Sequence, residues 1–286
     1  MTDVTADPNL AVYNAPEVVA HYAALDYLTP CEQVIFQTFL RDGMAVLDLG
    51  VGGGRTTPYL SSIASCYVGV DYAEEMVASC RQKFPGLQFQ TANAADLSSF
   101  PDASFDAVVV AFNGMDYVIP DESRFRCLRE IRRVLAPEGV LISSSHNPRA
   151  VLMRPSWNRR RLEALARSVT RGAPVFFRPV AGLLTLLRVG VALVMAFASS
   201  LGRAVRRIPT RAFWSGEGYF VDPVHGGLRT HCAAPANVER EVSEFGFRLL
   251  RVLGNDYPRT SFRYATHWYY YVFAKVEDVQ RKGTCA

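Results

Sequence analysis

The amino-acid sequence predicts an α/β fold in which helices cover both faces of a parallel sheet. Short apolar segments alternate with helical patterns between residues 43 and 147. Chain-breaking residues separate them, with Pro85-Gly86 after one helical pattern and Pro137–Gly139 after another. This alternation is typical of βαβ units. The chain has 286 residues and is 49% apolar, which is enough to bury a core and excludes wholesale disorder.

Five strands and three helices are expected in this central region. The strands are short, apolar and rich in β-branched residues, and their ranges are 45–49, 66–70, 87–92, 107–111 and 140–144. The helical patterns between them lie near residues 56–63, 74–83 and 123–135. Because parallel strands need helical crossovers, these elements are expected to form one sheet with helices on both faces.

The flanking regions add further elements. Residues 15–40 predict two helices separated at Thr29-Pro30. Residues 237–244 predict a helix that ends at Gly246. Two strands are then expected over 248–253 and 266–274, the second too aromatic and β-prone to be a helix.

The charge is distributed unevenly along the chain. Residues 149–211 contain thirteen Arg and a single acidic residue, Glu163, although the whole chain carries a net charge of only +4. We therefore expect a basic insert in an acidic protein, and no nucleic-acid partner. The six cysteines are scattered without a CxxC pair, which favours reduced structural thiols. The N-terminal residues contain no apolar signal segment, so a cytoplasmic location is expected.

The most specific motif is a glycine-rich turn after the first strand. Asp48, Gly50, Gly52 and Gly54 follow the spacing D-x-G-x-G-x-G. Glycine allows positive φ and lets a ligand approach the backbone closely. A dinucleotide-binding fingerprint requires glycine at position 55, which is Arg55 here, so a dinucleotide oxidoreductase is a weaker alternative.

Two further loops are expected at the same edge of the sheet. Asp71 ends the second strand, 23 residues after Asp48, where an acid can accept both hydroxyls of a ribose. The loop after the third strand contains Asn93, Ala94 and Asp96. Because the carboxyl ends of parallel strands meet at one crevice, these residues predict a nucleoside site.

Together these motifs resemble the class I S-adenosylmethionine-dependent methyltransferases over residues 43–147 and, more loosely, over the C-terminal strands. Asp48 and the three glycines match the family's first motif, in which the acid helps to hold the methionine amino group. Asp71 matches the ribose-binding acid. The resemblance places Tyr72 and Met76 against the adenine, and either Asn93 or Asp96 on its amino group. The full cofactor-binding set expected is Asp48, Gly50, Gly52, Gly54, Asp71, Tyr72, Met76, Asn93, Ala94, Asp96 and Phe112.

The resemblance also implies a fold and a division of the chain. It implies a Rossmann-like seven-stranded sheet in the order 3-2-1-4-5-7-6, with the last strand antiparallel and a helical insert after strand 5. The expected parts are an N-terminal helical lid, the cofactor-binding core, a basic apolar insert and the C-terminal part of the sheet, which span 1–42, 43–147, 148–218 and 219–286.

Residues on the acceptor side are less clearly indicated, because methyl transfer from a sulfonium needs alignment more than covalent catalysis. His146, after the fifth strand, is a candidate general base or a structural histidine. His225 and His231 form a second candidate group in a loop expected to enter the crevice. Tyr13 and Tyr22 either close over the cofactor or simply pack. The acidic residues form no tight carboxylate pair, so no metal requirement is expected.

The insert contains an unusually apolar segment at residues 180–202, flanked by arginines. Arg188 would lie in mid-membrane if this segment spanned a bilayer, at a cost of about 2.5 kcal/mol or more. The other interpretations are a helix on an anionic membrane surface, within residues 180–211, and a cap over an apolar or anionic substrate.

The sequence therefore predicts an enzyme that uses S-adenosylmethionine to methylate an O, N or S nucleophile. The expected acceptor is a small molecule that is apolar, lipid-like or anionic. The alternative is a membrane-docked regulatory module that binds the cofactor without turnover.

Overall fold

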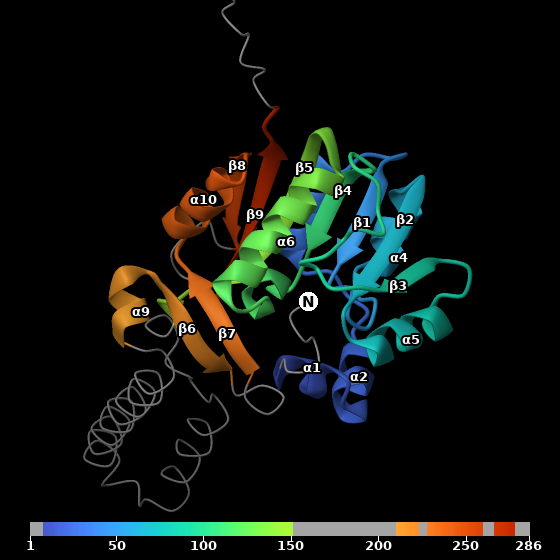
Figure 1. The fold of residues 1–286 in the computed structure, drawn as a ribbon, viewed down its shortest axis with the longest axis horizontal. Helices are drawn as coiled ribbons and strands as arrows, with labels where there is room; N and C mark the ends of the chain where they lie inside the picture. The colour runs from blue at the N-terminus through green and yellow to red at the C-terminus, as the bar shows by residue number, and fades with distance from the viewer. Residues whose placement is uncertain (1–7, 151–209, 223–227, 260–265, 278–286) are drawn as a thin grey trace, which may run out of the picture.

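The structure of the protein, a computed structural model, describes residues 8–150, 210–222, 228–259 and 266–277. A seven-stranded sheet with the order β3-β2-β1-β4-β5-β9-β8 forms its centre (Figure 1). This order confirms the predicted 3-2-1-4-5-7-6 arrangement, since β9 and β8 are the seventh and sixth strands of this sheet along the chain. Most of the predicted insert over residues 148–218 lies outside the described residues, namely residues 151–209, and so does His225.

The strands of the central sheet agree with the predicted ranges to within a few residues. They are β1 (Ala45–Leu49), β2 (Cys66–Asp71), β3 (Gln88–Thr91), β4 (Phe105–Val110), β5 (Leu135–His146), β8 (Phe247–Gly254) and β9 (Trp268–Lys275). The first five strands are parallel, and β9 is antiparallel to both of its neighbours. The carboxyl ends of β1, β2 and β4 therefore lie along one edge of the sheet, where ligands bind in open α/β folds.

Helices cover both faces of the sheet, as predicted (Figure 1). The N-terminal helices are α1 (Pro8–Tyr13), α2 (Pro16–Ala23) and α3 (Pro30–Phe39), and those of the core are α4 (Thr57–Ile63), α5 (Glu74–Lys83), η2 (Gly114–Tyr117), α6 (Asp121–Val134), α9 (Thr210–Ser215) and α10 (Pro235–Glu244). α6 and α10 pack on one face through Leu128, Ile131 and Val242. α3, α4 and α5 pack on the other through Phe36, Leu60 and Val77.

Alternate residues of each strand supply the two halves of the core. Leu47 and Val108 face the α6 side, whereas Val46 and Val109 face the α3 side. Both faces of the parallel strands are buried, which explains why these strands read as continuous apolar runs. Each fully buried side chain of this size stabilises the fold by roughly 1.5–3 kcal/mol.

A two-stranded sheet departs from the predicted organisation. The segment 219–231 is expected as a loop that enters the crevice, but its described residues, 219–222 and 228–231, lie in the antiparallel strands β6 (Glu217–Asp222) and β7 (Leu228–Ala233). This β6–β7 hairpin is separate from the central sheet. Its strands combine charged, aromatic and histidine residues, so they lack the simple apolar alternation by which strands are recognised.

Candidate active site

A glycine-rich turn joins β1 to α4 and forms one wall of the crevice. Gly50 has a φ of +77° and Gly52 a φ of +53°, a region that favours glycine. A side chain at Gly50 would meet no atom within 4 Å, so the backbone there faces open space. This turn is therefore shaped for close approach of a ligand to the backbone.

The other two glycines of the turn allow packing within the protein. A side chain at Gly53 would lie 2.3 Å from the backbone of Tyr22 and Ala23, so glycine lets α2 pack directly on the turn. A side chain at Gly54 would lie 2.4 Å from the ring of Phe84, just after α5. Gly54 is thus placed to pack the turn on α5 and does not line the cavity.

Asp71 ends β2 beside the glycine turn. Its carboxylate accepts hydrogen bonds from the backbone N–H groups of Gly52 at 2.9 Å and Ala73 at 3.0 Å. Burial raises the pKa of Asp71, and these backbone hydrogen bonds oppose the rise. A carboxylate has about four lone-pair sites, so two further hydroxyl donors can still be accommodated. The geometry fits the ribose of a nucleoside.

Asp48 lies behind the cavity wall. Its carboxylate accepts hydrogen bonds from the hydroxyls of Thr56 at 2.7 Å and Tyr67 at 3.0 Å. Burial raises its pKa to about 6, and the two hydroxyls oppose this rise. Thr56 lines the cavity and Asp48 does not. The structure therefore places Asp48 where it holds the turn, with Thr56 between its carboxylate and the open space.

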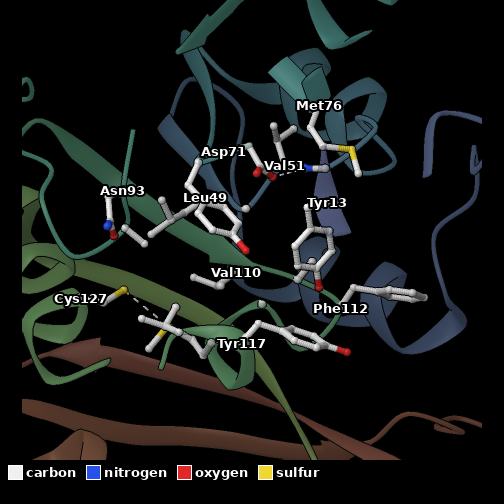
Figure 2. A pocket seen from close by; sticks show the side chains of 18 of the residues that line it. Tyr13, Leu49, Val51, Asp71, Met76, Asn93, Val110, Phe112, Tyr117 and Cys127 are labelled. Carbon is white, nitrogen blue, oxygen red and sulfur yellow. Dashed lines mark hydrogen bonds between the residues drawn. The ribbon is translucent and has the colours of Figure 1, made fainter. Parts of the chain in front are cut away.

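The crevice holds a cavity of about 650 Å³ (Figure 2). This volume is typical of pockets that bury a small-molecule ligand. Most of the predicted cofactor residues line this cavity, as do both predicted tyrosines of the lid: Tyr13, Tyr22, Gly50, Gly52, Asp71, Tyr72, Met76, Asn93, Ala94 and Phe112. The predicted residues that lie elsewhere are Asp48, Gly54, Asp96, His146 and His231.

The residues that line the cavity distinguish between the two candidates for contact with the adenine amino group, Asn93 and Asp96. Asn93 lies on the cavity wall, whereas Asp96 does not. Hydrogen bonds from Ser98 lower the pKa of Asp96, which is consistent with a local turn role. Asn93 is therefore the better placed of the two to meet a base.

Tyr13 of α1 lies at the centre of an aromatic group at one end of the cavity. Its ring centroid is 6.1 Å from that of Tyr22, 6.0 Å from that of Tyr72 and 5.9 Å from that of Tyr117. Burial raises the pKa of Tyr13 far above its ordinary value, and the neighbouring tyrosines and Asp71 add to this rise. Tyr13 is therefore a neutral hydroxyl at any physiological pH. Figure 2 shows its ring between Val51 and Phe112.

Arg55, the residue that argues against a dinucleotide, forms a buried ion pair. Its guanidinium donates to both oxygens of Glu32, at 2.5 and 2.7 Å, and Glu32 also belongs to the capping box that begins α3. The guanidinium carbon lies 4.5 Å from the ring centroid of Phe112. Phe112 has a φ of +56°, a strained conformation for a bulky residue. The Arg55 stack and the edge contact with Trp268 hold Phe112 in this position.

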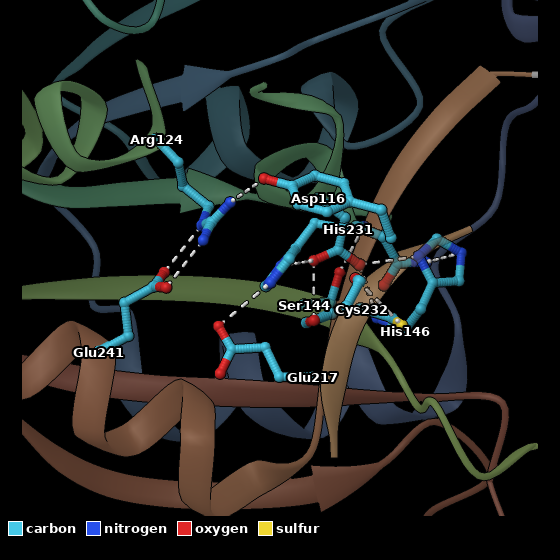
Figure 3. Close-up of polar contacts among 12 residues, drawn as sticks. Asp116, Arg124, Ser144, His146, Glu217, His231, Cys232 and Glu241 are labelled. Atoms are coloured by element: carbon cyan, nitrogen blue, oxygen red, sulfur yellow. Dashed lines mark hydrogen bonds and ion pairs between the residues drawn. The ribbon is translucent and has the colours of Figure 1, made fainter. Parts of the chain in front are cut away.

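A second polar cluster centres on the buried carboxylate of Asp116 in η2 (Figure 3). Asp116 accepts hydrogen bonds from Ser145 Oγ at 2.8 Å and from the backbone N–H of His146 at 2.7 Å, and His146 Nδ1 lies 2.8 Å away. Burial disfavours its charge, but the contacts with His146 and His231 lower its pKa overall. Nε2 of His146 faces the amide of Asn113 at 3.3 Å.

His231 connects this cluster to the β6–β7 hairpin. Its Nδ1 lies 3.9 Å from Asp116 and its Nε2 lies 3.6 Å from Glu217 (Figure 3). Burial opposes protonation, but the two carboxylates raise the pKa of His231 to about 9. At neutral pH His231 is therefore an imidazolium that joins the hairpin to η2.

Arg124 of α6 ties the same hairpin to α10. It donates two hydrogen bonds of 2.8 Å to the carboxylate of Glu241, and it also contacts Asp121 and Tyr219. The Tyr219 hydroxyl donates to Asp121 as well. These contacts position the hairpin, and with it Arg229, which lines the cavity.

The residues of the cavity wall that were not predicted as site residues include Tyr117, Arg229 and Arg55. Tyr117 lies close to Phe112 along the chain and Arg229 close to His231, but spacing alone does not show which side chains face inward. Arg55 was read only as evidence against a dinucleotide, although it lines the cavity and positions Phe112. Its pairing with Glu32 joins positions 23 residues apart, and no local pattern predicts such a contact.

Neither a metal cluster nor a membrane-spanning helix is found in the part of the chain that the structure describes. There, no three His, Cys, Asp or Glu side chains are grouped as metal ligands. None of the described helices is long and apolar enough to cross a bilayer.

Comparison with known proteins agrees with this fold and site. Residues 46–139 match the family model described as a methyltransferase domain. This stretch of the chain is therefore similar to a methyltransferase domain, and it contains the glycine turn, Asp71 and Asn93.

Similar proteins include a probable S-adenosylmethionine-dependent methyltransferase of Mycobacterium tuberculosis, 32% identical over 50% of this chain and 51% of that one. A demethylmenaquinone methyltransferase of Clavibacter sepedonicus is 32% identical over 41% of this chain and 47% of its own. The chain thus spans about half the length of the curated relatives it matches. A 1,6-didemethyltoxoflavin-N1-methyltransferase of Burkholderia thailandensis, solved with S-adenosylhomocysteine, shares the fold with a TM-score of 0.55 and 14% identity, covering 94% of this chain and 89% of that one.

Proposed function

We propose that the protein transfers the methyl group of S-adenosylmethionine to a small-molecule acceptor by in-line displacement. One observation carries the proposal: a single cavity joins the glycine turn and Asp71 to a chamber walled by Tyr13, Phe112 and Tyr117. A methyl transferase must hold two ligands end to end, and this cavity offers two walls of different chemistry.

The residues of the first wall fit the cofactor. The open backbone at Gly50 and the carboxylate of Asp71 would hold the nucleoside, with Tyr72, Met76 and Asn93 around the base. When bound, the cofactor supplies an activated methyl group with a neutral leaving group. The protein's own task is to hold the acceptor in line with this methyl group and to exclude water.

A hydroxyl or amine acceptor must also lose a proton. His146 remains our candidate base, because Asp116 orients its ring through Nδ1, while Nε2 faces the amide of Asn113 at 3.3 Å. Its ring packs edge-on against Tyr117 at 6.1 Å and does not line the cavity, so we propose that it takes the proton through an intervening water. Tyr13 and Tyr22 are proposed to align the acceptor as neutral hydroxyls. His225 and His231 are the other candidates, and the charge on His231 disfavours it as a base.

The acceptor is proposed to be a small organic molecule. Among similar proteins, two are named for demethylmenaquinone and for 1,6-didemethyltoxoflavin. The apolar and aromatic chamber supports an acceptor with an apolar or planar body.

The basic insert supports a further proposal, contact with an anionic membrane surface in the cytoplasm. Residues 180–211 combine an apolar segment with Arg203, Arg206, Arg207 and Arg211. Each basic residue near an anionic surface contributes about 1 kcal/mol. Deleting this segment is expected to abolish co-sedimentation with phosphatidylserine vesicles, and sedimentation that survives the deletion contradicts the proposal.

The catalytic proposal is tested by incubating the protein with S-adenosylmethionine and a panel of small metabolites. Production of S-adenosylhomocysteine that depends on an added acceptor supports it. Tight cofactor binding without product across the panel would favour a regulatory module that binds and does not turn over.

A further inference from the structure

We infer that the acceptor is a small aromatic carboxylate and that Arg229 binds its carboxylate group. This inference rests on the proposed methyl transfer and names the acceptor class for the same cavity. Its basis is the guanidinium of Arg229, which has no carboxylate partner in the part of the chain that the structure describes and which lies beside an aromatic chamber.

Arg229 lies on β7 and lines the same cavity as Gly50 and Asp71. Its side chain is exposed, whereas Leu228 and Thr230 on either side are buried. The guanidinium carbon lies 4.8 Å from the ring centroid of Tyr219, which favours one orientation of its plane. The backbone oxygen of Arg229 accepts a hydrogen bond of 3.1 Å from Asn9 of α1, which fixes the strand against the N-terminal helices.

The other arginines of the cavity wall are less suited to an acceptor. Arg55 is paired with Glu32 through both of its terminal nitrogens. Arg126 of α6 donates to Ser123 at 3.2 Å and helps to lower the pKa of Asp96, which places it on the side of the loop after β3. Among the residues that the structure describes, Arg229 has no carboxylate within ion-pair distance.

The wall near the lid is suited to a planar ring. Tyr13, Phe112 and Tyr117 all line the cavity, and Tyr13 meets Tyr117 nearly edge to face at 89°. Aromatic walls favour ring-shaped ligands through stacked and edge-on contacts. A ligand that meets both this wall and Arg229 therefore needs a ring and an anionic group.

The charge balance favours a carboxylate over a phosphate. The guanidinium of Arg229 has no carboxylate partner among the described side chains, and its planar fork fits one carboxylate in two parallel hydrogen bonds. The exposed carboxylate of Glu122, on the same cavity wall, disfavours a dianion.

The test compares ligands on the full-length protein saturated with S-adenosylhomocysteine. Isothermal titration measures 4-hydroxybenzoate, its uncharged analogue 4-hydroxybenzamide, and phenyl phosphate. We expect the wild type to bind the acid roughly tenfold or more tightly than the amide. Arg229→Gln should remove this preference, and the matched control Arg126→Gln should keep it. Binding of S-adenosylhomocysteine should be unchanged in both variants.

Each outcome is decisive for one proposal. Equal binding of acid and amide by the wild type, no binding of either, or a preference that survives Arg229→Gln overturns the inference. Stronger Arg229-dependent binding of phenyl phosphate overturns the carboxylate class. If the wild type fails to bind S-adenosylhomocysteine, the proposed function itself is contradicted, whatever the acids do.

Discussion

Asp71 is the residue whose contacts most directly link the fold to the ligand. Its carboxylate is fixed by two backbone hydrogen bonds, and its side chain lines the cavity. Asp48, which the sequence predicts as another cofactor-binding acid, is held behind Thr56. The two acids thus have different environments, and only a structure distinguishes them.

Replacing Asp71 by alanine is expected to weaken S-adenosylhomocysteine binding by about 2 kcal/mol, because charge-assisted hydrogen bonds to two hydroxyls are lost. The matched control is Asp96→Asn, which changes an exposed acid that does not line the cavity. Isothermal titration measures both affinities. Unchanged affinity in Asp71→Ala, or an equal loss in the control, would remove Asp71 from the binding site.

The packing of helix α2 on the glycine turn depends on a single glycine. A methyl group at Gly53 would overlap the backbone of Tyr22 and Ala23, and Gly53 does not have a positive φ, so the effect of alanine there is steric. Overpacking of this kind costs about 1–3 kcal/mol. The helix would have to move away from the glycine turn, and Tyr22 would move with it.

We therefore expect Gly53→Ala to speed proteolytic cleavage within residues 8–27 and to weaken cofactor binding. Gly86→Ala is a suitable control, because it strains a turn with a φ of +94° that meets no neighbouring atom. Limited proteolysis followed by mass spectrometry compares the two. Equal cleavage of the lid in both variants would show that packing on Gly53 does not hold α2.

The β6–β7 hairpin is held by charge, which makes its attachment sensitive to pH. The folded pKa of His231 is raised to about 9, above the ordinary value of about 6.5. The protonated form therefore stabilises the folded state fully below pH 6.5, and this contribution is lost as pH rises through about 9. Its size is at most about 3 kcal/mol.

Denaturant unfolding of the wild type and His231→Gln at pH 6, 8 and 10 measures this contribution. The wild type should be more stable than His231→Gln at pH 6. The difference between their free energies of unfolding should shrink by pH 10. Comparing the two proteins at each pH cancels other groups that titrate in the same range. A stability difference that stays constant from pH 6 to pH 10 would show that the charge of His231 does not hold the hairpin.

Whether an element could be predicted from the sequence depends on how far apart along the chain its stabilising partners lie. β1, β2 and β4 are buried on both faces, so their apolar runs identify them almost to the residue. The hairpin was missed because its stability comes from partners far along the chain, such as Arg124 with Glu241 and His231 with Asp116. Contacts of this kind leave no periodic pattern in the sequence.

At the scale of the whole molecule, the strand order could be predicted from the resemblance to the methyltransferase family. The motif residues that carry the resemblance indicate which strands border the crevice. Most of the wall around the glycine turn was predicted from the sequence, because its glycines and Asp71 need particular positions, but Asp48, Gly54 and Asp96 do not line the cavity. The acceptor wall was predicted only in part, because Tyr13 and Phe112 were expected at the site and Tyr117 and Arg229 were not. These four residues come from three separate segments, and only the fold brings them together.

The most direct test of the account is a crystal structure of the protein grown with S-adenosylhomocysteine. We predict the nucleoside between the glycine turn and Asp71, with the ribose hydroxyls on that carboxylate and the sulfur facing the chamber of Tyr13 and Phe112. Crystals in which this crevice stays empty at saturating ligand, or in which the ligand binds elsewhere, would contradict the assignment of the site and the function that depends on it.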